Sequence, residues 1–336
     1  MVRIGDIEIG KRTLVIAEIG NNHEGDFDTA KLLIERAAEA GVDAVKFQTI
    51  RADKFVARTE ERRFRQIKRF ELSDNQFREL SSFTKSRGLL FLSTPFDFDS
   101  VDMLDELVPA FKISSGDLNW YQFLEYISQK GKPILLSTGM SEVGEIARAL
   151  DTIARASSEP LEERVILLHC VSGYPVAISE ANLLSIPYLR ERFRIPVGYS
   201  DHTSGILACQ TAVALGACVI EKHFTYRKEN QSFRDHALSA DPAEMKELVA
   251  SIRHIEASLG EQDKRIMECE KQNITEMHRS LAAGKHLSKD EVITQEALTF
   301  LRPATGIPPE GLSSIIGRRA ARDIMEGSII REEDIE

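Results

Sequence analysis

Eight short apolar runs alternate with longer helical segments between Thr13 and Gly260, and no other feature of the sequence constrains the fold as strongly. Every run begins with apolar residues and finishes in polar residues or glycine; in chain order they are TLVIAEIG, AVKFQTI, LLFLSTPF, AFKISSG, PILLSTG, VILLHCVS, PVGYSDH and VIEKHFT. Strands that alternate with helices form parallel βαβ units, so the pattern predicts a (β/α)8 barrel, with an open doubly wound sheet as the alternative. Barrels of this kind carry their functional residues at the carboxyl ends of the strands.

The alternation of apolar runs and helical segments ends at Gly260. Residues 261–278 form a charged run, which predicts a helix that bridges two modules instead of packing in a core. Residues 279–336 contain short apolar pieces and closely spaced turns, which indicate a small separate domain. The sequence therefore predicts a barrel over residues 1–260, a linker over 261–278 and a small domain over 279–336 that should dock on another surface.

The composition argues against several classes of protein. A formal net charge of −10 disfavours binding to nucleic acid or to an anionic membrane. The four cysteines, Cys170, Cys209, Cys218 and Cys269, show no CxxC spacing, which favours buried thiols in a reducing compartment. The amino terminus alternates charged and apolar residues, and no apolar run approaches the length that spans a membrane. We therefore expect a cytoplasmic protein.

Two histidines end consecutive predicted strands. His202 closes PVGYSDH and His223 closes VIEKHFT, with a helical pattern between them that glycines bracket. Parallel neighbouring strands end on the same face, roughly 5 Å apart at the backbone, so two imidazoles could meet one metal ion. The alternative for either histidine alone is a hydrogen-bonded residue at a strand end. Their equivalent placement favours the metal site.

Lysines and hydroxyls gather at the other predicted strand ends. Lys46 and Lys112 end the second and fourth strands, and hydroxyls lie at or near the ends of the third to sixth, at Thr94, Ser115, Ser137 and Ser172. Such donors suit a phosphorylated or carboxylated ligand, although each serine alone is equally consistent with a helix N-cap. A lysine in a barrel mouth needs an anionic partner, either Glu18 or a bound substrate.

At these residues the sequence resembles the sialic acid synthase family, the N-acetylneuraminate synthases and their nonulosonate-forming relatives. The resemblance runs in order through IAEIGNNHEGD, AVKFQT, LSTPFD, FKISSGD, PILLSTGM, HCVSGYP, GYSDHT and EKHFT, and then through RSLAAG and LRPATGI. It implies a (β/α)8 barrel followed by an antifreeze-like (SAF) domain. It also implies condensation of phosphoenolpyruvate with an N-acylamino-sugar aldehyde, with a divalent metal that is usually manganese and otherwise magnesium or cobalt.

The resemblance assigns a role to each matching position. It makes His202 and His223 the metal ligands, and it places Glu18 beside the metal-bound water. The residues that would hold phosphoenolpyruvate are Lys46, Thr94, Lys112, Ser115, Ser137 and Ser200; those that would face the sugar are Gln48, Asp117, Tyr174 and Asp235, with Arg302 from the small domain. We predict Glu18, Lys46, Lys112 and Tyr174 to be catalytic, with an ion pair to either lysine as the structural alternative for Glu18.

Two departures from the family pattern concern the sugar. Ser172 and Gly173 stand where bacterial sialic acid-forming members tend to have an asparagine, and ENQSFRDHALS lacks a proline and glycine pair often seen before the aspartate matched by Asp235. The EKHFT and DHALS segments look closer to the sialic and legionaminic branches than to the pseudaminic one. We expect either N-acetylmannosamine or 2,4-diacetamido-2,4,6-trideoxymannose as the sugar.

The same residues are consistent with two other functions, and the small domain predicts an assembly. A different metal-dependent barrel aldolase or lyase would use Lys46 or Lys112 to form a Schiff base with a ketone. A non-catalytic sugar-binding protein would keep the barrel and use the small domain as a binding module. The small domain, the charged linker and the match at Arg302 predict a domain-swapped homodimer, in which one subunit's small domain covers its partner's barrel.

Overall fold

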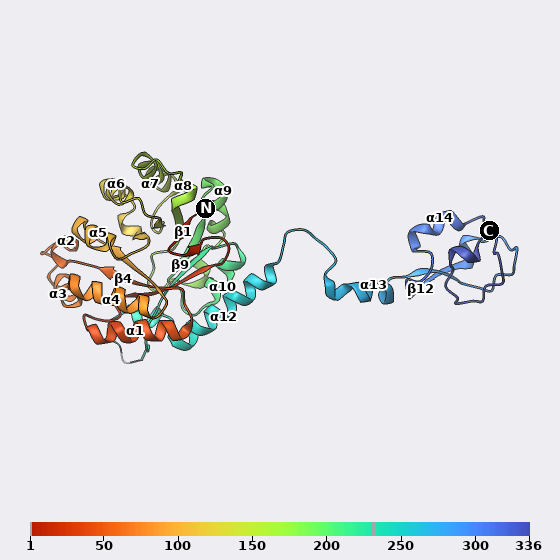
Figure 1. Cartoon of the computed structure of the whole chain (residues 1–336), viewed down its shortest axis with the longest axis horizontal. Helices are drawn as coiled ribbons and strands as arrows, with labels where there is room; N and C mark the ends of the chain where they lie inside the picture. The colour runs from red at the N-terminus through yellow and green to blue at the C-terminus, as the bar shows by residue number, and fades with distance from the viewer. Residues whose placement is uncertain (1, 230, 232) are drawn as a thin grey trace. The chain divides into compact units, whose positions relative to one another are not determined.

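The computed structural model describes residues 2–229, 231 and 233–336, and the chain divides into two compact units, Met1–Gly260 and Glu261–Glu336. Figure 1 shows helices surrounding the strands of the first unit. Its strands are β3 (Leu14–Gly20), β4 (Ala44–Thr49), β5 (Leu90–Pro95), β6 (Phe111–Ile113), β7 (Ile134–Ser137), β8 (Val165–His169), β9 (Val197–Asp201) and β10 (Val219–His223). They are hydrogen-bonded in the order β5-β4-β3-β10-β9-β8-β7-β6, and every pairing is parallel. Because β5 also lies against β6, the sheet closes on itself, which confirms the predicted barrel and excludes the open sheet.

The helices that follow these strands form the outer layer of the barrel. They are α1 (Phe27–Ala40), α4 (Asp74–Ser86), α5 (Phe98–Asp105), α6 (Tyr121–Ser128), α7 (Val143–Arg155), α9 (Ser185–Phe193), α10 (Leu207–Ala214) and α12 (Pro242–Leu259). Further helices lie in the connections: α2 (Ala52–Phe55), α3 (Glu61–Phe70), α8 (Leu161–Arg164) and α11 (Asp235–Leu238). Several helices of the outer layer begin at a capping residue. At the start of α1, for example, the Asp26 carboxylate accepts the Thr29 N–H. None of the described helices is long and apolar enough to cross a membrane.

The barrel interior is apolar at its amino-terminal end. A hairpin of β1 (Arg3–Ile4) and β2 (Ile7–Glu8) places Val2, Ile4 and Ile9 against the inward-facing side chains of the strands. Those side chains are Leu14, Ile16, Ala44, Leu92, Ala110, Leu135, Ile166, Leu168 and Val219, all without exposed surface. We call this cluster the barrel floor. It fills the lower part of the barrel, so that any ligand must bind at the opposite end, the mouth.

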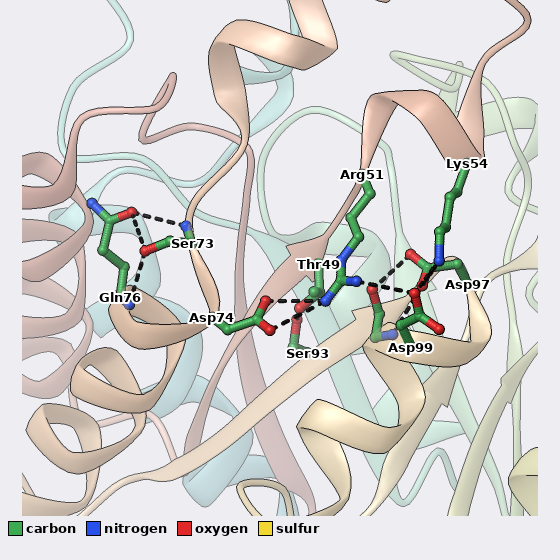
Figure 2. Close-up of polar contacts among 10 residues, drawn as sticks. Thr49, Arg51, Lys54, Ser73, Asp74, Gln76, Ser93, Asp97 and Asp99 are labelled. Atoms are coloured by element: carbon green, nitrogen blue, oxygen red, sulfur yellow. Dashed lines mark hydrogen bonds and ion pairs between the residues drawn. The ribbon is translucent and has the colours of Figure 1, made fainter.

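Ion pairs fasten the connections that follow β4 and β5 at the mouth (Figure 2). The buried hydroxyls of Thr49 and Ser93 are hydrogen-bonded at 2.7 Å where the two strands end. Just beyond, the Arg51 guanidinium lies 3.0 Å from an Asp74 carboxylate oxygen and 3.3 Å from one of Asp99. A capping box of Ser73 and Gln76 starts α4 in the same region, and Lys54 contacts Asp97 and Asp99. These contacts join three segments that are far apart in the sequence.

The second unit has its own small core. Strands β11 (Ser280–Ala283) and β12 (Leu298–Leu301) pair in antiparallel fashion, and helix α14 (Leu312–Ile315) follows. Buried apolar side chains including Leu281, Ile293 and Ile330 pack together there. Helix α13 (Lys271–Met277), within the predicted linker, buries no side chain, although the Thr275 carbonyl accepts the Ala304 N–H.

Candidate active site

The candidate site begins where the inward-facing side chains change from apolar to polar. Side chains alternate along a strand, so residues two apart face the same side. Going towards the carboxyl ends, Ile16 is followed by Glu18, Ala44 by Lys46, Leu92 by Thr94, Ala110 by Lys112, Leu135 by Ser137, and Val219 by Glu221 and His223. The same alternation that builds the floor therefore places a ring of polar groups at the mouth.

Two lysines and two carboxylates form the centre of this ring, and all four are almost completely buried. Lys46 Nζ lies 2.8 Å from a Glu18 carboxylate oxygen and 3.7 Å from one of Glu221, and it donates to Thr94 Oγ1 at 3.0 Å. Lys112 Nζ lies 3.9 Å from the other Glu221 oxygen, and Ser200 donates to that same oxygen at 2.8 Å. Glu18 therefore forms the ion pair with Lys46 that was the structural alternative to a catalytic role. Glu221 extends this network to Lys112.

Burial and neighbouring charges shift the pKa values of these four groups in different directions. Burial raises the pKa of Glu18 to about 7 in spite of Lys46. Burial also favours a raised pKa for Glu221, but Lys112 and Lys46 outweigh it and lower that pKa. Burial lowers the pKa of Lys112, whereas for Lys46 the two carboxylates outweigh burial and raise the pKa. Glu18 is thus the carboxyl that can exchange a proton near neutral pH.

The two histidines lie together at the mouth, as predicted, with ring centroids 5.5 Å apart. His202 Nδ1 is 2.8 Å from the Val171 carbonyl oxygen, a contact in which Nδ1–H donates and Nε2 keeps its lone pair. Burial lowers the pKa of His202 and lowers that of His223 well below its usual range, so both rings are neutral. His223 Nδ1 is buried and has no hydrogen-bond partner among the described residues.

Neutral, closely spaced imidazoles with a free ring nitrogen fit a divalent cation. Within the part of the chain that the structure describes, no group of three or more His, Cys, Asp or Glu side chains is arranged to hold a metal. A metal bound here would therefore have two protein ligands, and its other positions would be open to water or substrate.

A glycine lets hydroxyls converge on the fifth and sixth strand ends. A Cβ at Gly139 would lie 2.4 Å from Ser172 Oγ and 2.9 Å from Ser115 Oγ, so only glycine fits. Ser115 Oγ accepts the Gly139 N–H at 3.0 Å and lies 3.1 Å from Cys170 Sγ. Ser137 Oγ is buried without a hydrogen-bond partner among the described residues, so it is available to a ligand.

Among the residues expected to face the sugar, Tyr174 and Gln48 contact the histidines and the carboxylates of the mouth. Tyr174 packs on His202 with ring centroids 4.4 Å apart, and Arg234 lies 5.1 Å above the Tyr174 ring and donates to Asp235. Gln48 donates to a Glu18 oxygen at 3.1 Å.

The remaining predicted sugar contacts are Asp117 and Arg302. Asp117 follows Ser115 in a short helical turn, and burial raises its pKa to about 6. Arg302 is exposed in the second unit. The structure thus brings Gln48 and Tyr174 to the groups at the mouth.

Sequence reasoning missed Glu221 and Cys170. Glu221 lies two residues before His223 on the same strand, and this spacing alone would have placed its carboxylate on the inner face. Cys170 was interpreted as a buried thiol, which it is, but its contact with Ser115 depends on two strand ends that are not adjacent in the sequence.

The large cavity beside the mouth does not coincide with this network. Its volume is about 780 Å³, and it lies between the β7–α7 connection, the loop after β8 and α9. Of the predicted residues that the structure describes, only Ser172 lines it. The buried charges, and not the cavity, locate the site.

Comparisons with known proteins match both units. The NeuB family model matches residues 33–264, and the SAF domain model matches residues 278–336. An N,N'-diacetyllegionaminic acid synthase of Campylobacter jejuni is 40% identical over 336 residues, which is 96% of this chain and 100% of that protein. A Methanocaldococcus jannaschii protein described as uncharacterized is 44% identical over 337 residues, or 99% and 98% of the two chains. The crystal structure of N-acetylneuraminic acid synthetase from Leptospira borgpetersenii, in complex with citrate, gives a TM-score of 0.75 at 34% identity, covering 81% of this chain and 94% of that one.

A (β/α)8 barrel with a buried lysine, carboxylate and histidine mouth, joined to a SAF domain, defines a class of sugar-acid synthases. The chain belongs to the NeuB family of nonulosonic acid synthases.

Proposed function

We propose that this protein condenses phosphoenolpyruvate with an open-chain N-acylamino sugar, which yields a nine-carbon 2-keto acid and inorganic phosphate. The observation that carries the proposal is the buried mouth, where two lysines, two neutral histidines and a Ser137 hydroxyl without a partner among the described residues meet Glu18, a carboxyl of raised pKa. The pyruvyl donor comes from the family resemblance, and Lys112, whose nearest carboxylate oxygen is 3.9 Å away, supplies positive charge for an anion.

Phosphoenolpyruvate would bind to the lysines and hydroxyls. Lys112 donates to the Ile113 carbonyl at 3.1 Å, and its nearest carboxylate oxygen is 3.9 Å away, so its charge is only partly compensated. Ser137 and the Ser115 hydroxyl add neutral donors on neighbouring strand ends. Fixed donors of this kind replace the water that the anion loses on binding.

His202 and His223 would hold a divalent cation, for which we propose Mn²⁺. Such an ion supplies Lewis acidity, which polarises the sugar carbonyl and lowers the barrier to attack at its carbon. The protein's own contribution is to keep both imidazoles neutral and to orient His202 through the Val171 carbonyl.

Glu18 is our proposed general base. The vinyl C3 of phosphoenolpyruvate attacks the sugar carbonyl carbon, whose oxygen becomes an alkoxide, and water adds to C2 while Glu18 takes its proton. That proton passes to the sugar alkoxide, and the remaining hemiketal proton leaves with phosphate. Cleavage of the C2–O bond then releases phosphate and leaves the ketone. A carboxyl with a pKa near 7 accepts and returns a proton efficiently at neutral pH.

For the sugar we propose 2,4-diacetamido-2,4,6-trideoxymannose, with N-acetylmannosamine as the second candidate. The support is the 40% identity to a diacetyllegionaminic acid synthase over 96% of this chain, against 34% over 81% to the Leptospira sialic acid synthetase structure. The Ser172 and Gly173 pair also departs from the sialic acid-forming pattern. The sugar would meet Gln48, Tyr174, Asp117 and Asp235.

Phosphate release with a panel of sugars tests this proposal. We expect phosphate only when phosphoenolpyruvate, Mn²⁺ and one of the acylamino sugars are all present, fastest with the diacetamido sugar. Faster turnover of N-acetylmannosamine or of the altrose isomer would change the sugar, while no phosphate with any sugar would refute the activity. Phosphoenolpyruvate with ¹⁸O in the bridging position should transfer that label to phosphate, since the C2–O bond breaks.

One observation favours a Schiff-base aldolase as the second candidate function. Burial lowers the pKa of Lys112, which increases the fraction of free amine. Borohydride in the presence of a ketone substrate separates the two: a covalent adduct at Lys112 would support the aldolase, and an unmodified protein the condensation.

We also propose that Arg302 serves the barrel of a partner subunit in a two-fold dimer. Its support is the resemblance at LRPATGI. Mixing inactive Glu18→Ala and Arg302→Ala subunits should restore roughly a quarter of the sites if exchange is random, because one site of each mixed dimer receives both intact residues. No recovery after verified exchange would show that each Arg302 serves its own chain.

A further inference from the structure

The outer faces of β9 and β10 carry a buried ion pair. Lys222 and Asp201 are opposite each other in the parallel register, with Nζ 2.7 Å from Oδ2 and neither side chain exposed. Because side chains alternate, this pair faces the helix layer, while Glu221 and His223 face the barrel interior. The pair therefore lies directly behind the residues of the candidate site.

The pair also holds the backbone next to His202. The Asp201 carboxylate accepts three further hydrogen bonds, from the Tyr199 hydroxyl at 3.0 Å, the Thr203 N–H at 2.9 Å and the Cys209 thiol at 3.2 Å. Lys222 donates in turn to the Thr203 carbonyl. Both peptide groups of the residue that follows His202 are thus bound by the two members of one ion pair.

Two contacts hold the backbone at His202: its carbonyl accepts the Val176 N–H at 2.9 Å, and the ion pair binds the next residue, Thr203. The β9–β10 ladder ends at the Asp201 and Lys222 pair, so His202 lies one residue beyond it. His223, by contrast, pairs with Glu18 of β3, and its carbonyl accepts the Ala240 N–H at 2.7 Å. The loop after β8 orients the His202 ring through Val171 and binds its carbonyl through Val176, while the ion pair binds both peptide groups of Thr203.

We propose that Lys222 and Asp201 are positioning residues that set His202 relative to His223. A buried ion pair is seldom more stabilising than apolar residues of the same volume, because both charges lose their hydration. Apolar residues would fill this space but could not bind the Thr203 peptide groups. The inference depends on the proposed function in one respect, namely that His202 and His223 bind a divalent cation.

The test uses the variant Asp201→Asn/Lys222→Met, which removes both charges and nearly conserves volume. We expect Mn²⁺ affinity, measured by titration calorimetry without substrate, to fall about 10- to 100-fold, as for other groups that orient metal ligands. Arg253→Met is the matched control, because it breaks the 3.0 Å ion pair with Asp43 at the start of β4. The control should lower stability in urea and leave Mn²⁺ affinity unchanged. An unchanged affinity in the double variant would overturn the proposal.

A milder change covers the case in which the double variant fails to fold. Tyr199→Phe removes one donor to Asp201 and keeps both charges. It should weaken Mn²⁺ binding by a few-fold, about what one hydrogen bond contributes, and no change would count against the proposal.

The imidazole ¹⁵N spectrum of the metal-free protein separates this inference from the proposed function. In the double variant the His202 signals should move, whereas those of His236, which is hydrogen-bonded to Thr225, should stay. Stationary His202 signals would overturn the positioning role. If the wild-type protein bound no Mn²⁺, the metal function would fail, and the shift of the His202 signals would still decide the inference.

Discussion

The floor and the mouth of the barrel are built by the same strands and have opposite properties. At the floor, inward side chains such as Ile166 and Leu135 are apolar and fully buried. At the mouth, equally buried positions hold Glu18, Lys46 and Glu221, and some polar atoms lack a partner among the described residues. Burying charge costs free energy unless it is paired, so the mouth is a place where stability is given up for binding. We therefore expect substitutions at the mouth to lower activity and substitutions at the floor to lower stability.

The largest effect should come from the histidines. His202→Ala and His223→Ala should each lower kcat/KM by more than about 100-fold, because loss of a ligand exceeds the loss of a group that only orients one. Steady-state phosphate release measures the rate, and circular dichroism should show an intact fold. Chelator treatment of the wild type should reproduce the defect, and Mn²⁺ should restore activity better than Ca²⁺, which prefers more oxygen ligands. Full activity after complete metal removal would contradict the assignment.

At the floor, Ile166→Ala should show the opposite behaviour. Truncation of a fully buried isoleucine costs about 2 to 5 kcal/mol of unfolding free energy, since it removes apolar contacts and leaves a cavity. Urea unfolding measures this loss. At temperatures where the variant stays folded, its kcat should remain close to that of the wild type; a large loss of kcat would show that floor and mouth are not independent.

Protonation of Asp117 should link stability to pH. Its pKa is raised to about 6 from an ordinary 3.8, so the folded protein binds the proton more tightly than the unfolded chain. The stabilisation from Asp117 protonation is therefore complete below pH 3.8 and is lost as the pH rises through 6, by on the order of 3 kcal/mol. Asp117→Asn should flatten this part of the stability curve. A curve of the same slope in the variant would assign the effect to another carboxyl.

The smallest effect on stability should come from Ser137→Ala. Its hydroxyl has no hydrogen-bond partner among the described residues, so removal should change the unfolding free energy by less than about 0.5 kcal/mol. The KM for phosphoenolpyruvate should rise about 10-fold, the effect of one hydrogen bond to a charged ligand.

Ser128→Ala is the matched control for Ser137→Ala. The Ser128 hydroxyl donates to the Ile153 carbonyl at 3.0 Å in the helix layer. The control should lose about 1 kcal/mol of stability and keep its KM. A KM that rises equally in both variants would remove Ser137 from the anion site.

Much of the architecture was predictable from the sequence because it depends on local periodicity. The eight runs, the change of texture after Gly260 and the two histidines at consecutive strand ends are all properties of short segments. Alternation along a strand then determines which residues face inward, and this would have included Glu221. The family resemblance added the chemistry, which periodicity does not contain.

Which of these groups meet depends on the closed barrel. Glu221 lies between Lys46 and Lys112 because strands from different parts of the chain close into a ring, and Lys222 meets Asp201 because β9 and β10 pair in one particular register. Register and closure result from the packing of the whole barrel, and a shift of one residue would turn every side chain to the other face. The polar residues at the strand ends are visible in the sequence alone, whereas the contacts that shift the pKa of Glu18 and hold His202 arise only when the barrel closes.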